Sequence, residues 1–310
     1  MATFLTDIIL AAFSLIMSGA CLHFANALYN LKKYHVNFRT LIVSLLIFNS
    51  TYYFLVFVFE MIFIITGDNN YFDVMILVDF YILYGGIYYL QLFIFIERII
   101  AVSCISRYEL SSSEPPYIAL GFMILSFGVT ALHKILIRNV FEAYDIMSFE
   151  IIILSVLAFL VYHYLHKKEI DKRENDFLQY LTNNLSYKFQ YYENQKTYSL
   201  TKYLLGIFLV FESLRLISRA VLDSFTRCPN FHTIMYLTVF VLSIMKIVAH
   251  LYVFVLNEPK MRESFINLFD SRCRGYSEND SNVALYVNSN SLESADRERI
   301  YFYGYRRQKD

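Results

Sequence analysis

Seven long apolar stretches run through this chain of 310 residues and restrict it to a bundle of helices embedded in a membrane. They cover residues 8–30, 40–65, 74–96, 117–137, 151–165, 203–222 and 233–256. Most contain the roughly 20 residues that a helix needs to cross a hydrocarbon core about 30 Å thick, and residues 147–150 can extend the short fifth stretch. Among open segments only a helix pairs its own backbone groups in lipid. The sequence therefore predicts an all-α membrane protein with seven transmembrane helices.

The basic residues between these stretches fall almost entirely on alternate connections, and this pattern predicts an orientation. Most of the lysines and arginines follow the first, third, fifth and last stretches, beginning with Lys32 and Lys33. The other connections hold only Lys134, Arg138 and Arg227. Because positive charge collects on the cytoplasmic side, we expect the N-terminus outside the cell and the C-terminus in the cytoplasm.

The chain divides into one bundle domain at residues 1–257 and two segments that follow it. The connection at residues 166–202 is polar and free of glycine and proline, so we expect the fifth and sixth helices to extend into the cytoplasm. Residues 258–275 carry apolar side chains at helical spacing between charges, which predicts an amphipathic helix on the inner membrane surface. Residues 276–310 have the polar composition of a disordered tail. Cys273, between two arginines, is a candidate for S-palmitoylation, and a free thiol is the alternative.

An acid and an arginine, Glu97 and Arg98, are adjacent at the end of the third stretch. G-protein-coupled receptors place such a pair at the cytoplasmic end of the third helix, where the acid holds the arginine until the helices part. The alternative is that Arg98 only marks the membrane edge and extends its charge to water. Because the charge would lie near water, we expect Arg98→Ala to cost the bundle little stability while it abolishes coupling to a G protein.

Two further motifs resemble those of a known receptor family. The segment ERIIA at residues 97–101, followed by RYE at residues 107–109, resembles a signature of nematode serpentine chemoreceptors. The segment LSYKFQYYEN at residues 185–194 is similar to a second block of the same group, the Sra superfamily, and most of all its class epsilon, the Sre family. The resemblance covers essentially the whole chain. It implies a G-protein-coupled-receptor-like fold, a chemical ligand from the environment, expression in sensory neurons and signalling through a heterotrimeric G protein. The residues that it assigns to G-protein coupling are Glu97, Arg98, Arg107 and Tyr108.

Six ionisable residues lie within the predicted spans: Glu60, Asp79, Glu212, Arg215, Arg219 and Lys246. A charge at a helix centre costs roughly 2.5–3.5 kcal/mol on insertion scales, so we expect these side chains to face the bundle interior. They form either a structural network of ion pairs or a polar site for a ligand. Glu212 and Lys246 lie at similar depth and are expected to pair between the sixth and seventh helices. Glu212→Ala should then strand a buried charge, and adding Lys246→Ala should recover part of the loss.

Other functions are open to some of these residues. Asp79 lies where amine receptors hold a ligand ammonium, although its separation from Arg98 turns it to a face about 100° away. Lys246 raises the hypothesis of an opsin, which the absence of tryptophan and the incomplete motif at residues 257–259 oppose. A seven-span ligand-gated channel or a transporter is the main alternative to a receptor. Insect odorant channels have the opposite orientation, and the chain has no inverted repeat typical of transporters.

The remaining classes have less support. The sequence contains no HExxH, GxSxG or nucleotide-binding loop, so we predict no enzyme activity, no cofactor and no metal site. A formal net charge of zero gives no basis for nucleic-acid binding. The expected partners are a small-molecule ligand, a heterotrimeric G protein and the lipid bilayer.

Overall fold

A computed structural model describes most of the chain. The described residues are 2–31, 34–67, 74, 81–104, 108, 116–137, 140–175, 185–223, 231–258, 261–263 and 266. The chain forms two compact units, Met1–Arg262 and Glu263–Asp310, and the helical bundle lies in the first.

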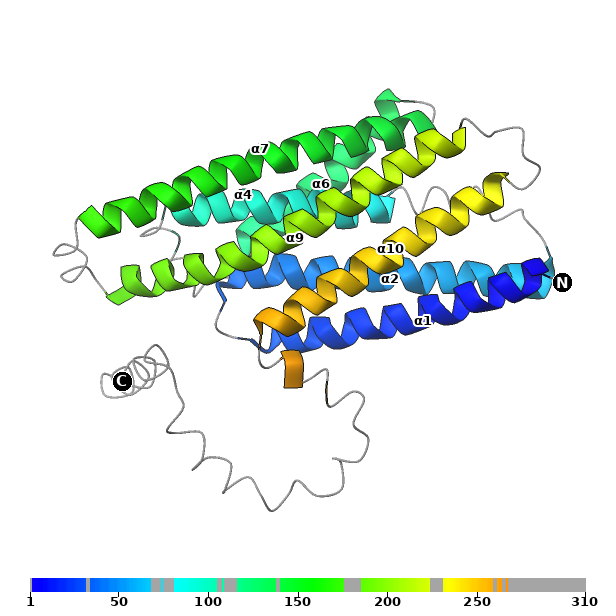
Figure 1. Cartoon of the computed structure of the whole chain (residues 1–310), viewed down its shortest axis with the longest axis horizontal. Helices are drawn as coiled ribbons and strands as arrows, with labels where there is room; N and C mark the ends of the chain where they lie inside the picture. The colour runs from blue at the N-terminus through cyan, green and yellow to red at the C-terminus, as the bar shows by residue number, and fades with distance from the viewer. Residues whose placement is uncertain are drawn as a thin grey trace, which may run out of the picture. The chain divides into compact units, whose positions relative to one another are not determined.

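All regular structure in the described part of the chain is helical (Figure 1). The elements are α1 (Ala2–Tyr29), α2 (Val36–Thr66), η1 (Tyr81–Tyr88), α4 (Tyr89–Ser103), α6 (Tyr117–Leu136), α7 (Val140–Asn175), α9 (Leu185–Asp223) and α10 (Phe231–Asn257). The segment η1 is π-helical and continues directly into α4. Each of the seven apolar stretches of the sequence overlaps a described helix. The third stretch corresponds to η1 and α4 together.

Among the described residues, six helices are long and apolar enough to cross a membrane. These segments are Thr6–Tyr29, Val36–Thr66, Tyr81–Ser103, Tyr117–Leu136, Ile146–Asp171 and Leu237–Asn257. The exception is α9, because three charged residues, Glu212, Arg215 and Arg219, interrupt its apolar part. Six of the predicted spans are therefore confirmed as apolar helices, and the sixth in chain order stays a prediction.

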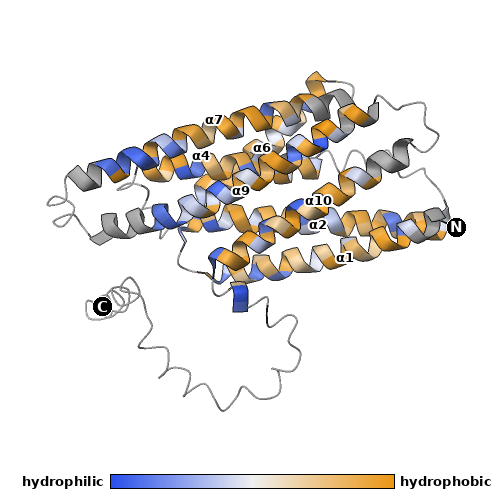
Figure 2. Ribbon diagram, viewed as in Figure 1, coloured by the Kyte–Doolittle hydropathy of each residue, from blue (hydrophilic) through white to orange (hydrophobic). Residues whose placement is uncertain are grey.

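The ends of several helices differ from the predicted ones. The apolar part of α7 begins at Ile146, so the short fifth stretch is extended as the sequence suggested. Both α7 and α9 continue well beyond their apolar parts, as predicted for the polar connection between them. Figure 2 shows hydrophilic residues toward the end of α7 and toward the start of α9. The third helix is described only from Tyr81 and runs on to Ser103, beyond the predicted end at residue 96.

The helix formed by η1 and α4 is the most enclosed of the six apolar helices described above. About 83% of the apolar window in Tyr81–Ser103 is buried, against 17% in α6. It packs against α2, α6, α7 and α9, while α1 lies along α2 and α10 lies along α9. Large apolar side chains on the outer helices, such as Ile124 and Ile135, are exposed, as expected for surfaces that face lipid.

A pair of glycines lets two neighbours approach η1 closely. A Cβ atom on Gly85 would lie 2.7 Å from the ring of Phe127 on α6. A Cβ atom on Gly86 would lie 2.8 Å from the ring of Phe48 on α2. The two rings also pack edge to face, with their centroids 5.4 Å apart. The sequence therefore has small residues where α2 and α6 meet the central helix.

Little of the predicted cytoplasmic tail belongs to the described residues. The backbone N–H groups of Met261 and Arg262 donate to the carbonyl of Glu258, which forms a helical turn after α10. Most of the predicted amphipathic helix, Cys273 and residues 276–310 lie outside the described part of the chain.

Candidate functional site

Arg98 lies near the end of α4 and is completely buried, with 0% of its surface exposed. Its guanidinium group stacks over the ring of Phe38 on α2, 4.3 Å from the ring centroid. The alternative that Arg98 marks the membrane edge and reaches water is therefore wrong. Because the side chain is buried, the expectation that Arg98→Ala costs the bundle little stability is no longer supported.

Glu97 binds the guanidinium group of Arg98 through both carboxylate oxygens. Arg98 Nε donates to Oε2 and Nη2 donates to Oε1, each at 2.6 Å. Glu97 is also fully buried. Two parallel charge-assisted hydrogen bonds fix the orientation of both side chains, so the adjacent acid holds the arginine as the sequence suggested.

The other side of the Arg98 guanidinium joins α4 to α9. Nη1 donates to the hydroxyl of Thr197 at 3.3 Å and lies 3.8 Å from Oε1 of Glu193. Thr197 in turn donates to the backbone carbonyl of Glu193 at 2.8 Å. Nη2 also donates to the hydroxyl of Tyr108 at 3.1 Å. A single buried arginine thus connects α4, the start of α9 and the segment that follows α4.

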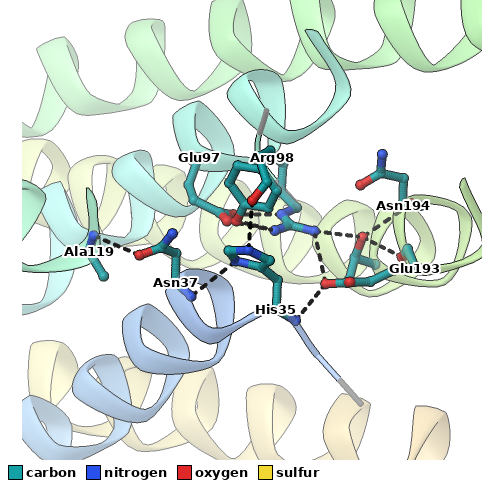
Figure 3. A network of polar contacts seen from close by, with 9 residues as sticks. His35, Asn37, Glu97, Arg98, Ala119, Glu193 and Asn194 are labelled. Atoms are coloured by element: carbon teal, nitrogen blue, oxygen red, sulfur yellow. Dashed lines mark hydrogen bonds and ion pairs between the residues drawn. The ribbon is translucent and has the colours of Figure 1, made fainter. Parts of the chain in front are cut away.

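His35, the N-cap residue of α2, adds polar contacts to this arrangement, as Figure 3 shows for His35, Glu97, Arg98 and Glu193. The backbone N–H of His35 donates to Oε1 of Glu193 at 2.7 Å. The His35 ring lies against that of Tyr108, with centroids 3.9 Å apart. We call the residues His35, Glu97, Arg98, Tyr108, Glu193 and Thr197 the Arg98 cluster.

The contacts of the His35 ring suit a neutral imidazole. Nδ1 accepts from the backbone N–H of Asn37 at 3.3 Å, so Nε2 carries the proton and donates to the carbonyl of Tyr108 at 3.1 Å. Burial, followed by the charges of Arg98 and Arg39, lowers the pKa of His35 to about 3. The Arg98 cluster therefore contains an uncharged histidine at neutral pH.

A second buried cluster lies farther along α9. Glu212 accepts from Nε of Arg215 through Oε2 and from Nζ of Lys246 through Oε1, each at 2.8 Å. The Glu212–Lys246 pair joins α9 to α10 and is the acid–base pair between helices that the sequence predicts. All three side chains face the interior, with Glu212 3%, Arg215 9% and Lys246 4% exposed.

Further contacts tie this second cluster to η1 and α7. Nη2 of Arg215 donates to the hydroxyl groups of Tyr84 and Ser148, and these two hydroxyl groups are hydrogen-bonded to each other at 2.8 Å. Nζ of Lys246 lies over the ring of Tyr88, 4.3 Å from its centroid. We call Tyr84, Tyr88, Ser148, Glu212, Arg215 and Lys246 the Glu212 cluster.

The remaining predicted residues belong to neither cluster. Glu60 is buried on α2. Asp79 and Arg107 lie outside the described residues, as does the side chain of Arg219, whose backbone belongs to α9. The described residues contain no group of His, Cys, Asp and Glu side chains that could hold a metal ion.

Several members of the two clusters were not singled out from the sequence. Glu193 lies in the segment LSYKFQYYEN, so its position was noted, but no function was assigned to it. His35, Thr197, Tyr84 and Ser148 have no pattern that marks them, since each reaches its partners across large separations in sequence. The hydrogen bond from His35 to Glu193, for example, joins residues 158 positions apart.

Most of the chain matches a known protein family. Residues 69–308 match the family model described as Sre G protein-coupled chemoreceptor, which is more than half of the chain. The match includes Arg98 with its partners on α9, and the whole Glu212 cluster. None of the curated proteins compared with the chain matches it.

Proposed function

The chain belongs to the Sre family of G protein-coupled chemoreceptors, and from this membership we propose that it binds an external small molecule and activates a heterotrimeric G protein. The family and the six apolar helices make the chain a multi-pass membrane protein and a chemosensory receptor rather than an enzyme. The ligand and the G protein are the parts that we propose.

We propose that α9 also crosses the membrane, as the sixth of seven spans in chain order. Its charged residues Glu212 and Arg215 face the interior of the bundle and engage Lys246, Tyr84 and Ser148, so lipid would meet its apolar side chains. With seven spans the two termini lie on opposite sides of the membrane. The positions of the lysines and arginines then favour the N-terminus outside and the Arg98 cluster on the cytoplasmic side.

The complete burial of Arg98 is the observation that best supports coupling to a G protein. Its guanidinium group bridges α4 and α9, so these helices cannot separate without breaking its contacts to Thr197 and Glu193. We infer that this arrangement is the resting state. In the active state α9 would move away, and Arg98 would become accessible to the partner from the cytoplasmic side.

Three substitutions in the full-length receptor test this proposal. Thr197→Val keeps the shape of the side chain but removes the hydroxyl that accepts from Arg98, so we expect higher signalling without ligand. Arg98→Ala should abolish signalling. It would also strand the buried Glu97 carboxylate, so the pair Glu97→Gln with Arg98→Ala serves to recover surface expression.

Lys168→Ala is the matched control, because Lys168 is an exposed basic residue on α7. Calcium or cAMP signals in cells that express each variant, normalised to surface expression, give the result. A double variant at Glu97 and Arg98 that reaches the surface and still activates a G protein would contradict the proposal. Ligand-dependent currents that persist in cells without G proteins would favour the channel instead.

A further inference from the structure

The Glu212 cluster contains unequal numbers of positive and negative charges. Its described side chains include one carboxylate, Glu212, and two cations, Arg215 and Lys246. Both cations bind the same carboxylate, one through each oxygen atom. The other polar members, Tyr84 and Ser148, are neutral hydroxyl groups. A surplus positive charge in a buried site is unfavourable unless an anion accompanies it.

Arg215 also has hydrogen-bonding capacity left over. Its Nε donates to Glu212, and its Nη2 donates to Tyr84 and Ser148. A guanidinium group has five N–H donors, and among the described residues Nη1 has no hydrogen-bond partner. The side chain keeps 11% of its surface exposed, although the residue is otherwise enclosed. Lys246 likewise uses one of its three donors on Glu212.

The walls of the cluster are aromatic. Lys246 lies 4.3 Å from the ring centroid of Tyr88 and 6.0 Å from that of Phe208. Arg215 lies 5.8 Å from the ring centroid of Tyr88. Such surroundings exclude water, strengthen an ion pair and favour a ligand with an apolar body.

We propose that the Glu212 cluster is the binding site for a small organic carboxylic acid whose carboxylate pairs with Arg215 and Lys246 and whose apolar part packs against Tyr88 and Phe208. This inference rests on the proposed function as a chemoreceptor and adds the chemical class of the ligand. Carboxylate is favoured because it matches the planar donor array of a guanidinium group. The ligand neutralises the second cation, so ligand and Glu212 together balance Arg215 and Lys246.

Thermal unfolding of the purified full-length receptor in detergent tests the binding step directly. The probes are sodium 4-phenylbutyrate and sodium octanoate, each compared with the alcohol of the same carbon skeleton. We expect the carboxylates to raise the Tm in a saturable manner and the alcohols to leave it unchanged. Equal protection by the alcohols would overturn the proposal. Sodium chloride is a second comparison. If it raises the Tm as much as the carboxylates do, and if substitutions of Arg215 and Lys246 remove this effect, the site binds inorganic anions and the proposal is also overturned.

Variants assign the effect to the cluster. Lys246→Met leaves the neutral Glu212–Arg215 pair, so this variant should fold, and it should bind the carboxylates about 10- to 100-fold more weakly. Arg215→Lys keeps the charge but loses the planar donors and should weaken binding as well. Lys202→Met, at an exposed lysine on the same helix, is the matched control and should bind normally. Unchanged affinity in Lys246→Met and Arg215→Lys would refute the site.

Signalling measurements separate this inference from the proposed function. If carboxylates bind in a manner that depends on Lys246 but cause no G-protein response, the proposed carboxylate site is supported and the proposed receptor function is contradicted. A G-protein response to neutral or cationic compounds, without carboxylate binding, would support the receptor and refute the carboxylate site.

Discussion

Removing Glu212 should destabilise the bundle more than removing either of the cations that it binds. Glu212→Ala leaves both Arg215 and Lys246 without their carboxylate in a buried site. Lys246→Ala instead leaves the Glu212–Arg215 pair, with Arg215 still hydrogen-bonded to Tyr84 and Ser148. The two substitutions delete the same 2.8 Å contact but leave different charges behind.

The magnitudes follow from these remaining charges. Breaking a buried ion pair and stranding its partner costs about 3–5 kcal/mol, which we expect for Glu212→Ala. A hydrogen bond to a charged group contributes roughly 1.5–3 kcal/mol, which we expect for Lys246→Ala. The double variant loses one stranded cation relative to Glu212→Ala, so it should be more stable than that single variant. Its loss should therefore fall below the sum of the two single losses by more than the Lys246→Ala loss itself, which is roughly 1.5–3 kcal/mol.

Surface expression and thermal unfolding in detergent, measured for both single variants and the double variant, give this comparison. Lys202→Ala, on the exposed side of α9, controls for the loss of a lysine from the protein. Strictly additive losses would show that Glu212 and Lys246 do not interact. A Lys246→Ala variant that is less stable than Glu212→Ala would refute the argument from charge balance.

Three further predictions concern other parts of the molecule. An epitope tag at residue 1 should stain intact cells and one at residue 310 only permeabilised cells; the reverse would exclude the proposed orientation. The pKa of His35 is about 3 in the folded protein against 6.5 for the free side chain, so the unfolded state binds more protons between these values. As the pH decreases below 6.5, His35 should therefore lower the free energy of unfolding by up to about 1.4 kcal/mol per pH unit. The variant His35→Asn retains a helix cap but does not titrate. It should therefore make the Tm depend less on pH. Gly86→Ala should cost roughly 1–3 kcal/mol because its Cβ would meet Phe48, whereas Gly128→Ala, with no atom within 4 Å, should not destabilise the protein in the same thermal assay.

The Glu212–Lys246 pair was predictable because the membrane leaves few options for charged residues. Charges within apolar stretches must face the interior, and those at similar depth on successive helices then tend to meet. Glu212 and Arg215 are also three positions apart in the sequence, a spacing that puts two residues on one face of a helix. Here the sequence pattern was strong because each charge stands among apolar neighbours.

In the Arg98 cluster the sequence marks Glu97, Arg98 and Tyr108, but not their partners on α2 and α9. The adjacency of Glu97 and Arg98 is visible in the sequence, but the depth of Arg98 is not. Its burial depends on Phe38 and Thr197, which α2 and α9 bring to it from 60 and 99 positions away. Periodicity along one helix carries no information about such contacts, so the arginine was expected near water.

The two clusters are connected because the same pair of helical elements contributes to both. The helix formed by η1 and α4 supplies Tyr84 to one cluster and Arg98 to the other, while α9 supplies Arg215 and Thr197. Thr197 and Glu212 lie fifteen positions apart on α9, about 22 Å along a regular helix. A movement of α9 relative to α4 therefore changes hydrogen bonds in both clusters at once. A ligand that draws Arg215 away from Tyr84 would favour that movement, and the loss of the Arg98–Thr197 contact would follow from the rigidity of the helix rather than from a separate signal.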